Sequence, residues 1–296
     1  NHWADIIVEK SCKVPYAVGA YLHETYERLY HERETPRQSK TKFSKELIKD
    51  AEVVIFNKTK MNEEMLCDAP NVKLLCVTAT GFDNIDLEYA KSRGIAACNI
   101  KDYSTPAVVQ HTFALALSVL EKIRYYDDYV KSGAYSEQLG FSHFEKTYFE
   151  LQGKTWGIIG LGNIGRRVAD IARAFGANVI YYSTSGKNDQ PGYNRVDLDT
   201  LLRNSDIVSV HAPLNSDTEG LMNKTAFSKM KPTAIFLNLG RGAIVVEQDL
   251  ADALNKHQIA GAGLDVLYKE PMSPDNPLNA EATVKKAFWL TAVILC

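Results

Sequence analysis

Residues 154–182 read KTWGIIGLGNIGRRVADIARAFGANVIYY, and this stretch decides the fold. The apolar run at 155–159 predicts a buried strand, and the sequence Gly160-Leu-Gly-Asn-Ile-Gly165 follows it at once. A helix is expected next, because apolar residues then recur at helical spacing along one face: Ile164, Val168, Ile171, Ala172 and Phe175. Gly176 stands where a left-handed residue would end this helix, and residues 179–182 predict a second strand.

The three glycines of this turn suit a strand–turn–helix unit that binds a dinucleotide. Gly160 permits the tight turn, Gly162 lets the backbone approach a pyrophosphate, and Gly165 lets helix and strand pack closely. The helix N-terminus would then offer N–H groups and a partial positive charge to the phosphates. A glycine-rich turn without a nucleotide is the less favoured interpretation, because the flanking strand, helix and length all match the motif.

The composition is that of an ordinary globular protein of about two domains. The chain has 296 residues, of which 45% are apolar and 24% charged, and its formal net charge is −2. We therefore expect no nucleic acid partner and no membrane association. No basic and apolar leader is visible, so we expect a cytoplasmic protein. No metal site or disulfide framework is expected, because the cysteines are scattered: Cys12, Cys67, Cys76, Cys98 and Cys296.

Short apolar runs alternate with helical patterns along the chain, which predicts parallel sheets with helices on their faces. Before the glycine turn, strands are expected at 6–8, 53–56, 74–77 and 95–98, and helices at 42–49, 86–92 and 105–131. Asp86 is expected to be the N-cap of the helix at 86–92, and Gly94 to terminate that helix. After it, strands are expected at 207–210, 234–237, 262–266 and 288–295, and helices at 199–203, 225–230 and 247–256. Residues 132–152 show no clear periodicity and are interpreted as an extended excursion.

Ser183 stands where such a unit usually carries an acid for the adenosine ribose hydroxyls. The first carboxylate downstream is that of Asp189. An uncharged hydroxyl removes the repulsion that an acid would impose on a 2′-phosphate, and Lys187 would pair with that phosphate, which favours NADP. Ser183 could equally hydrogen-bond the ribose of NAD, so the sequence leaves NAD and NADP open.

Five further motifs accompany the nucleotide unit: Thr78-Ala-Thr-Gly-Phe-Asp-Asn-Ile-Asp86, Tyr103-Ser-Thr-Pro-Ala-Val-Val-Gln-His111, Val208-Ser-Val-His-Ala-Pro-Leu214, Asn238-Leu-Gly-Arg-Gly-Ala-Ile244, and Gly263-Leu-Asp-Val266 with Glu270-Pro271. From about residue 53 to about residue 278, the chain with these motifs resembles the D-isomer-specific 2-hydroxyacid dehydrogenases. That family includes glycerate, lactate and phosphoglycerate dehydrogenases and hydroxypyruvate reductases. Several ordered motifs at compatible spacings make this resemblance more specific than the glycine fingerprint alone.

The resemblance implies an α/β protein of two Rossmann-like, doubly wound parallel-sheet domains with an active-site cleft between them. Residues 1–104 would form the catalytic domain, completed in relatives by a C-terminal return helix that this sequence lacks, and residues 105–296 the dinucleotide-binding domain. The cofactor would be NAD or NADP, and the substrate a small 2-keto or 2-hydroxy acid. Residues 105–152 resemble the family's dimerisation arm, so a homodimer is expected.

The resemblance also implies a role for individual residues. Arg241 matches the arginine that holds the substrate carboxylate and polarises the carbonyl, and a planar guanidinium suits that task. Glu270 matches the glutamate that orients the catalytic histidine, and the N–H groups around Thr80 and Gly81 match the loop that binds the substrate carboxylate. Asp265 matches the residue that accepts a hydrogen bond from the nicotinamide carboxamide. The remaining cofactor positions are Gly160, Gly162, Asn163, Ile164, Gly165, Ser183, Ala212, Pro213, Thr218, Leu239 and Gly240.

The sequence departs from the family at the catalytic histidine. The family's Pro-His pair follows the glutamate by a little over twenty residues, and Ala292 and Val293 stand at that register here. The sequence holds no histidine beyond His257, and His211, in the adenosine loop, is interpreted as structural. Because valine cannot transfer a proton, we expect turnover to be ~10²–10⁴-fold slower.

Two explanations account for this departure. An altered or truncated C-terminus on an ordinary dehydrogenase is favoured, because Arg241, Asp265 and Glu270 are all present. The alternative is a catalytically silent NAD(P)H-binding module that reports redox state to a protein partner.

Overall fold

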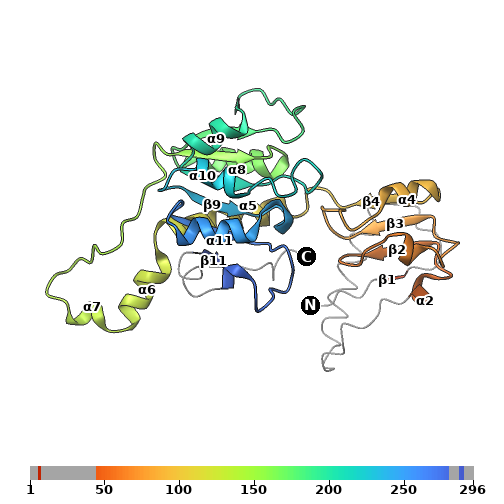
Figure 1. Cartoon of the computed structure of the whole chain (residues 1–296), viewed down its shortest axis with the longest axis horizontal. Helices are drawn as coiled ribbons and strands as arrows, with labels where there is room; N and C mark the ends of the chain where they lie inside the picture. The colour runs from red at the N-terminus through yellow and green to blue at the C-terminus, as the bar shows by residue number, and fades with distance from the viewer. Residues whose placement is uncertain (1–5, 8–44, 280–286, 290–296) are drawn as a thin grey trace. The chain divides into compact units, whose positions relative to one another are not determined.

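The computed structural model describes residues 6–7, 45–279 and 287–289, and the chain divides into two units between Lys101 and Asp102 (Figure 1). Each unit is built around one sheet with its own core. Ala292 and Val293 lie outside the described residues, as do parts of the segments expected as helix 42–49 and strand 288–295.

The first unit contains a four-stranded sheet in the order β1-β2-β3-β4. Its strands are β1 (Ile6–Ile7), β2 (Val53–Phe56), β3 (Leu74–Val77) and β4 (Ala96–Asn99). Strands β2, β3 and β4 are parallel, as expected, whereas β1 pairs antiparallel with β2. The expectation of an all-parallel sheet was therefore wrong at β1, an edge strand, where a sheet of parallel strands tolerates an antiparallel neighbour.

Among the described residues of this unit, three short helices accompany the sheet: α2 (Lys45–Ile48), α3 (Glu63–Leu66) and α4 (Leu87–Ser92). The Oδ1 atom of Asp86 accepts a hydrogen bond of 2.9 Å from the Tyr89 backbone N–H, which confirms Asp86 as the N-cap of α4. Gly94 has φ +68° just after the helix, as expected of a terminator. The core is formed by fully buried side chains, among them Ile48, Phe56, Met61, Leu66 and Leu75.

The second unit contains a seven-stranded sheet in the order β11-β10-β9-β8-β5-β6-β7. Every neighbouring pair in it is parallel. The strand order reverses between β5 and β8, which confirms the doubly wound sheet. The strands are β5 (Thr155–Ile159), β6 (Asn178–Tyr182), β7 (Asn194–Arg195), β8 (Ile207–Val210), β9 (Ile235–Asn238), β10 (Gly261–Leu264) and β11 (Ala287–Trp289).

Helices cover both faces of this sheet. On one face α5 (Thr105–Leu120) and α8 (Asn163–Ala174) bury a cluster around Phe113 and Trp156. On the other face α9 (Leu198–Asn204), α10 (Lys224–Lys229) and α11 (Glu247–Asn255) bury a cluster around Phe227 and Phe236. The described residues of this unit also form two 3-10 turns, η1 (Gly242–Ile244) and η2 (Pro277–Asn279). The two cores hold the sheet rigid from both sides, so its strand ends are fixed points for a site.

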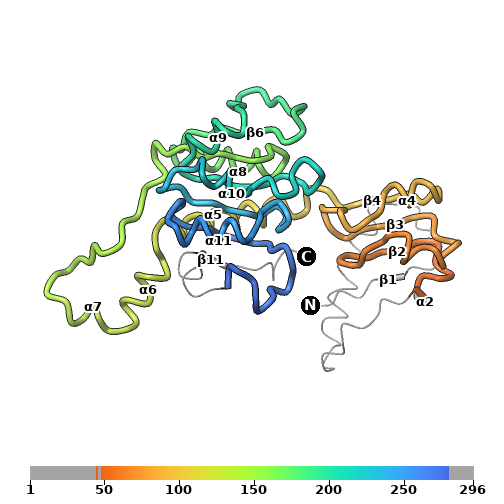
Figure 2. Tube along the Cα trace, viewed as in Figure 1, coloured from red at the N-terminus to blue at the C-terminus, as the bar shows by residue number. Residues whose placement is uncertain are grey.

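The single helix expected at 105–131 is instead two helices, α5 and α6 (Ile123–Lys131), because Lys122 adopts φ +54°. Lys122 Nζ donates to the carbonyl of Val119 at 3.0 Å, which satisfies one of the last carbonyls of α5. Beyond this break no residue of α6 is buried, and the chain leaves the sheet through α7 (Ala134–Glu137) before it returns to β5 (Figure 2). We call residues 122–149 the arm.

A membrane-spanning helix and a metal-binding cluster are both absent from the part of the chain that the structure describes. Within it, no helix has the length and apolar character needed to cross a bilayer. The same residues contain no group of three or more histidine, cysteine or acidic side chains arranged to hold a metal ion.

Candidate functional site

The glycine turn leaves β5 at the point where the strand order reverses, and open α/β sheets bind ligands at this point. Gly160 has φ +92°, and a Cβ atom there would lie 2.8 Å from the Cα atom of Ala212. A Cβ atom on Gly165 would lie 2.3 Å from the carbonyl oxygen of Gly160. Both glycines are therefore required for the turn to pack against α8 and the loop after β8.

Gly162 differs from its neighbours, because a Cβ atom there would meet nothing within 4 Å. Gly162 is also the N-cap of α8, so no capping side chain occupies the first-turn N–H groups of that helix. The side chain of Asn163 donates to Asp102 and accepts from Arg166, while Ile164 packs on the core below. The turn is thus an open cradle lined by helix N–H groups, which fits a pyrophosphate.

Ser183, at the end of β6, is buried and closes a turn. Its Oγ atom accepts a hydrogen bond of 3.2 Å from the backbone N–H of Asn188. The Nδ2 atom of Asn188 donates in turn to the carbonyl of Leu161 at 2.8 Å, which ties this turn to the glycine turn. Because a hydroxyl that accepts one hydrogen bond can still donate its own hydrogen, Ser183 remains able to bond a ribose oxygen. Asn188 gave no signal in the sequence.

The loop after β8 holds a partly buried histidine, His211, whose ring is neutral. The Nε2 atom of His211 lies 3.1 Å from Ser209 Oγ, and burial lowers the pKa of His211 to about 3. Its backbone N–H donates to the carbonyl of Ile159 at 2.9 Å, which ties the loop to β5. These contacts support the structural interpretation of His211.

Thr218 shapes the same loop from inside. The residue is fully buried, and its hydroxyl donates to the carbonyl of Pro213 at 2.7 Å. The hydroxyl also accepts a 2.9 Å hydrogen bond from the backbone N–H of Asn215. These bonds fix Ala212 and Pro213 opposite the glycine turn, so Thr218 acts on the loop through its backbone.

A tight turn after β9 presents Arg241. Asn238 stabilises this turn at both ends, because its Nδ2 atom donates to the carbonyl of Arg241 at 3.0 Å and its Oδ1 atom accepts from the N–H of Gly240 at 3.1 Å. A Cβ atom on Gly240 would lie 2.9 Å from the carbonyl oxygen of Ala212. Leu239 is buried, and the Arg241 residue is half-buried. The backbone of this turn is therefore held in place.

The segment that carries Glu270 packs directly on this turn. A Cβ atom on Gly242 would lie 1.9 Å from the carbonyl group of Leu267, so only glycine fits there. Glu270 Oε1 accepts a 3.1 Å hydrogen bond from the N–H of Leu267. Glu247 Oε1 accepts a 2.8 Å hydrogen bond from the N–H of Tyr268. Within the second unit, the structure therefore places the Arg241 turn against the segment that bears Glu270.

Asp265 follows β10 and is buried. Its backbone N–H donates to the carbonyl of Asn238 at 3.0 Å, and its Oδ1 atom lies 3.3 Å from the Nε2 atom of His111 on α5. No role could be assigned to His111 from the sequence, because it is one of several polar residues in a long helical pattern. Only the packing of α5 against β9 and β10 brings it to Asp265.

In the first unit, side chains hold the backbone around Thr80 and Gly81. Thr80 Oγ1 donates to the carbonyl of Ile100 at 3.1 Å, and Asn99 Nδ2 donates to the carbonyl of Thr80 at 2.7 Å. Asn57 Nδ2 donates to the carbonyl of Thr78 at 3.3 Å. With its carbonyls taken by these side chains, the loop has a fixed backbone, which suits recognition through N–H groups.

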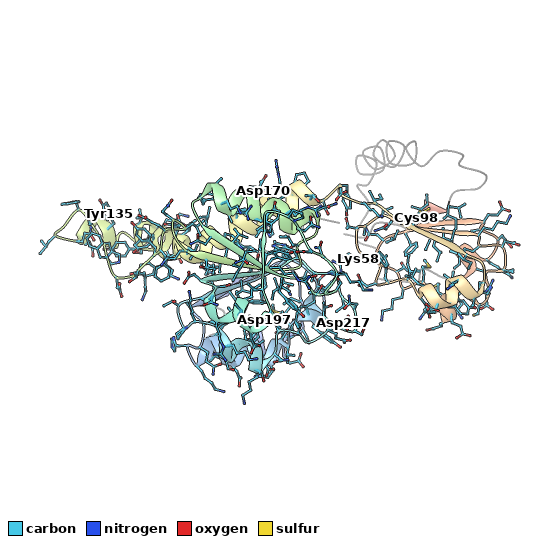
Figure 3. The ribbon with its side chains drawn as sticks, turned by 90° about the horizontal axis from the view of Figure 1, so that it is seen from above. Lys58, Cys98, Tyr135, Asp170, Asp197 and Asp217 are labelled. Carbon is cyan, nitrogen blue, oxygen red and sulfur yellow. The ribbon has the colours of Figure 1, made fainter. Side chains whose placement is uncertain are left out.

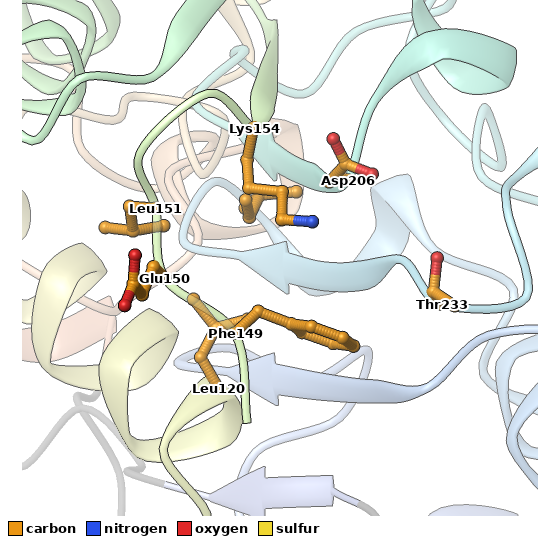
Figure 4. A pocket seen from close by; sticks show the side chains of 8 residues that line it. Leu120, Phe149, Glu150, Leu151, Lys154, Asp206 and Thr233 are labelled. Carbon is orange, nitrogen blue, oxygen red and sulfur yellow. The ribbon is translucent and has the colours of Figure 1, made fainter. Parts of the chain in front are cut away.

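A pocket lies at the opposite edge of the second sheet, where β5, β8 and β9 begin (Figure 4). Its polar residues are tied to the strands, because Asp206 accepts from the backbone N–H of Thr155 at 2.9 Å and pairs with Lys231 at 2.9 Å. The pocket is lined by Leu120, Phe149, Glu150, Leu151, Lys154, Asp206, Ile207 and Thr233. These residues include none of the expected site residues, so this pocket is separate from the glycine cradle.

Comparisons with known proteins agree with this geometry. Residues 113–288 match the family model described as D-isomer specific 2-hydroxyacid dehydrogenase, NAD binding domain. The chain is 40% identical over 235 residues to a hydroxypyruvate reductase of Blautia hydrogenotrophica, an alignment that covers 78% of this chain and 72% of the relative. It is also 40% identical over 221 residues to a glyoxylate reductase of Aeropyrum pernix, covering 73% of this chain and 66% of the relative.

One of the most similar solved structures is an acyclic imino acid reductase in complex with NADPH and D-Arg. It superimposes with a TM-score of 0.77 at 31% sequence identity, over 96% of this chain and 87% of the other. The alignments with the two curated reductases span 72% and 66% of the lengths of those relatives.

Proposed function

The chain belongs to the D-isomer-specific 2-hydroxyacid dehydrogenase family, and on that premise we propose that it transfers a hydride between NADH or NADPH and a small 2-keto acid. The observation that carries the proposal is the open cradle at Gly162, built at the switch point of the sheet beside the tightly held Arg241 turn. The first provides a place for a dinucleotide, and the second provides a cation for a carboxylate.

The described residues fit a bound nicotinamide dinucleotide, which supplies the hydride. Gly160–Gly165 and the N-terminus of α8 would hold the pyrophosphate, and Ser183 the adenosine ribose. Ala212 and Pro213 would lie beneath the adenosine, on the loop that Thr218 fixes. Leu239, Gly240 and Asp265 would face the nicotinamide end, with Asp265 accepting a hydrogen bond from the carboxamide.

Arg241 is the proposed substrate cation. Its guanidinium would bond the substrate carboxylate in two-point fashion and polarise the carbonyl that receives the hydride. The backbone N–H groups around Thr80 and Gly81 are the proposed contribution of the first unit to binding of the same carboxylate. These contacts recognise only the 2-keto acid group, so the identity of the side chain is set elsewhere.

We propose that proton transfer to the substrate carbonyl is impaired in this chain. A carbonyl that accepts hydride must also receive a proton, and Val293, at the register of the family's histidine, cannot donate one. Glu270 would orient that histidine and has no chemical role without it. We therefore propose that the 296-residue chain turns over slowly, and that V293H raises kcat by on the order of 10²-fold.

Titration of NADH and NADPH by fluorescence, followed by glyoxylate, hydroxypyruvate or pyruvate, tests the proposal. Cofactor oxidation that depends on the keto acid, and that rises in V293H, is the expected result. Tight cofactor binding with no oxidation in either protein would instead favour the silent NAD(P)H-binding module. A parallel panel with each keto acid plus an amine separates ketone reduction from reduction of the corresponding imine, the reaction suggested by the imino acid reductase likeness.

We further propose that the protein is a homodimer joined through the arm. The arm carries large apolar side chains that are exposed in the single chain (Figure 3 labels Tyr135 among them): Ile123, Val130, Tyr135, Leu139, Phe141, Phe144 and Tyr148. An apolar surface of this kind on a projecting segment is typical of an interaction site rather than of a free surface.

A further inference from the structure

His111 and Asp265 form an enclosed pair on the nicotinamide side of the proposed cofactor site. The Nε2 atom of His111 lies 3.3 Å from Asp265 Oδ1, and only 14% and 6% of the two side chains are exposed. A carboxylate buried to this degree requires hydrogen-bond donors, because transfer of a bare charge from water is strongly unfavourable. The 3.3 Å contact places the His111 ring nitrogen, a group that can carry a donor hydrogen, next to Asp265 Oδ1.

The backbone that carries His111 is rigid. Val108, Val109, Phe113 and Leu115 of α5 are buried around it, so the helix cannot rotate without opening the core. A Cβ atom on Gly263 of β10 would lie 3.2 Å from Leu115 Cβ, which shows how closely α5 packs on that strand. His111 is therefore held at a fixed distance from the end of β10, where Asp265 begins.

Asp265 itself is anchored at its backbone, because its N–H donates to the carbonyl of Asn238 at 3.0 Å. This bond fixes the Cα atom but leaves the carboxylate able to turn about its side-chain torsions. The contact with His111 restricts that rotation by holding Oδ1 toward α5.

We propose that His111 is a positioning residue that holds Asp265 in the orientation in which its carboxylate accepts a hydrogen bond from the nicotinamide carboxamide. This inference rests on the proposed function, through the role given there to Asp265. In this role His111 acts on the cofactor through Asp265 and takes no part in the chemical step. Its loss should weaken recognition of the nicotinamide while leaving the rest of the dinucleotide bound as before.

The test compares NADH with ADP-ribose, which lacks the nicotinamide, on the full chain by calorimetry or fluorescence. H111F fills the space but removes the donor, whereas H111Q keeps an amide N–H at about the reach of Nε2. We expect H111F to weaken NADH binding about tenfold, the effect of losing a charge-assisted hydrogen bond, and ADP-ribose binding less than twofold. H111Q should recover most of the NADH affinity.

A double-mutant cycle then asks whether the effect passes through Asp265. H111F introduced into D265A should change NADH affinity less than twofold, because there is no carboxylate left to orient. Equal weakening of NADH and ADP-ribose in H111F would show a structural role and overturn the inference. An unchanged NADH affinity in H111F would overturn it as well.

Misfolding of H111F and failure of the wild-type chain to bind nucleotide are two outcomes that can be told apart from a loss of positioning. If H111F fails to give a cooperative thermal transition, the same comparison is made with H111Q and H111N. H111N is expected to weaken NADH selectively, because its shorter amide does not reach Asp265, and equal affinities in H111Q and H111N would overturn the inference. If the wild-type chain binds neither NADH nor ADP-ribose, the proposed function fails, whatever His111 does.

Discussion

The turns at the carboxyl edge of the second sheet and the arm are opposite in construction. In the turns, Gly165, Gly240 and Gly242 occupy places where one added carbon would collide with backbone. In the arm, Leu139, Phe141 and Phe144 are large side chains with almost no neighbours in the single chain. The turns pack against other segments of their own chain, whereas the apolar side chains of the arm need a partner to cover them. Substitutions in the two regions should therefore change different properties.

The largest effect is expected from a side chain placed in the glycine turn. G165V would push a branched side chain into the carbonyl of Gly160, so α8 cannot pack on β5 and nucleotide binding should be lost altogether. Thermal unfolding and NADH titration measure the two consequences. G162A is the matched control, because its methyl group meets no protein atom and should leave the melting temperature within about 2 °C.

G162A should nevertheless weaken NADH by about tenfold, because the added methyl group occupies the space left for the pyrophosphate. A G162A protein that binds NADH as tightly as wild type would contradict the cradle. A G165V protein with normal stability would contradict the packing.

Loss of the Arg241 side chain is expected to have the next largest effect. R241L should lower kcat/KM for glyoxylate or hydroxypyruvate by ~10²–10³-fold, because the variant removes both the carboxylate partner and the charge that stabilises the transition state. The background for this assay is V293H, if the wild-type rate is too low to measure. R241K should recover only part of the loss, since an ammonium cannot make the two-point contact. ADP-ribose affinity should be unchanged in both variants, and a parallel loss there would show that the turn itself had been disturbed.

The sequence predicted the packed region better than the exposed one, and the reason is physical. Alternating apolar runs and glycines report local backbone demands, so β2, β3, β5 and β8 have the bounds expected for them. The cap at Asp86 followed for the same reason. What the sequence could not give were contacts made across long separations. The pairing of His111 with Asp265 and the tie from Asn188 to Leu161 depend on how whole elements pack.

The break at Lys122 was missed because the helical pattern continues through it. Apolar residues at 123–130 keep helical spacing, but their partner is not the core of the same chain. A sequence pattern indicates that one face of a helix is apolar, but it does not indicate which surface covers that face. The backbone structure of the arm was therefore predicted worst from the sequence, and that of the turns at the carboxyl edge of the second sheet was predicted best.

A smaller effect in the packed region is expected from His211, through the pH dependence of stability. Its pKa is about 3 in the fold against an ordinary value of 6.5, so the unfolded chain binds the proton more tightly. Stability should be unaffected by this residue above pH 6.5 and should fall as pH drops toward 3, by about 1.4 kcal/mol per pH unit. In H211Q that contribution should vanish. Urea denaturation of both proteins at pH 7 and pH 5 measures this contribution, and equal pH dependence in the two would refute the neutral state of the His211 ring.

The smallest effect on the site is expected from the arm. F141D places a charge on a side chain that is 91% exposed in the single chain, so the fold has no reason to change. If a second copy covers this surface, burial of the aspartate there would be strongly unfavourable, and the dimer dissociation constant should rise at least tenfold. Sedimentation velocity over a range of concentrations measures this constant.

S136D, on an exposed polar position of α7, is the matched control and should leave the dimer dissociation constant unchanged. NADH affinity should be the same in all three proteins, because the glycine cradle is completed within one chain. A dimer as stable in F141D as in wild type would place the subunit contact elsewhere, and a monomeric wild type would leave the arm for a different partner.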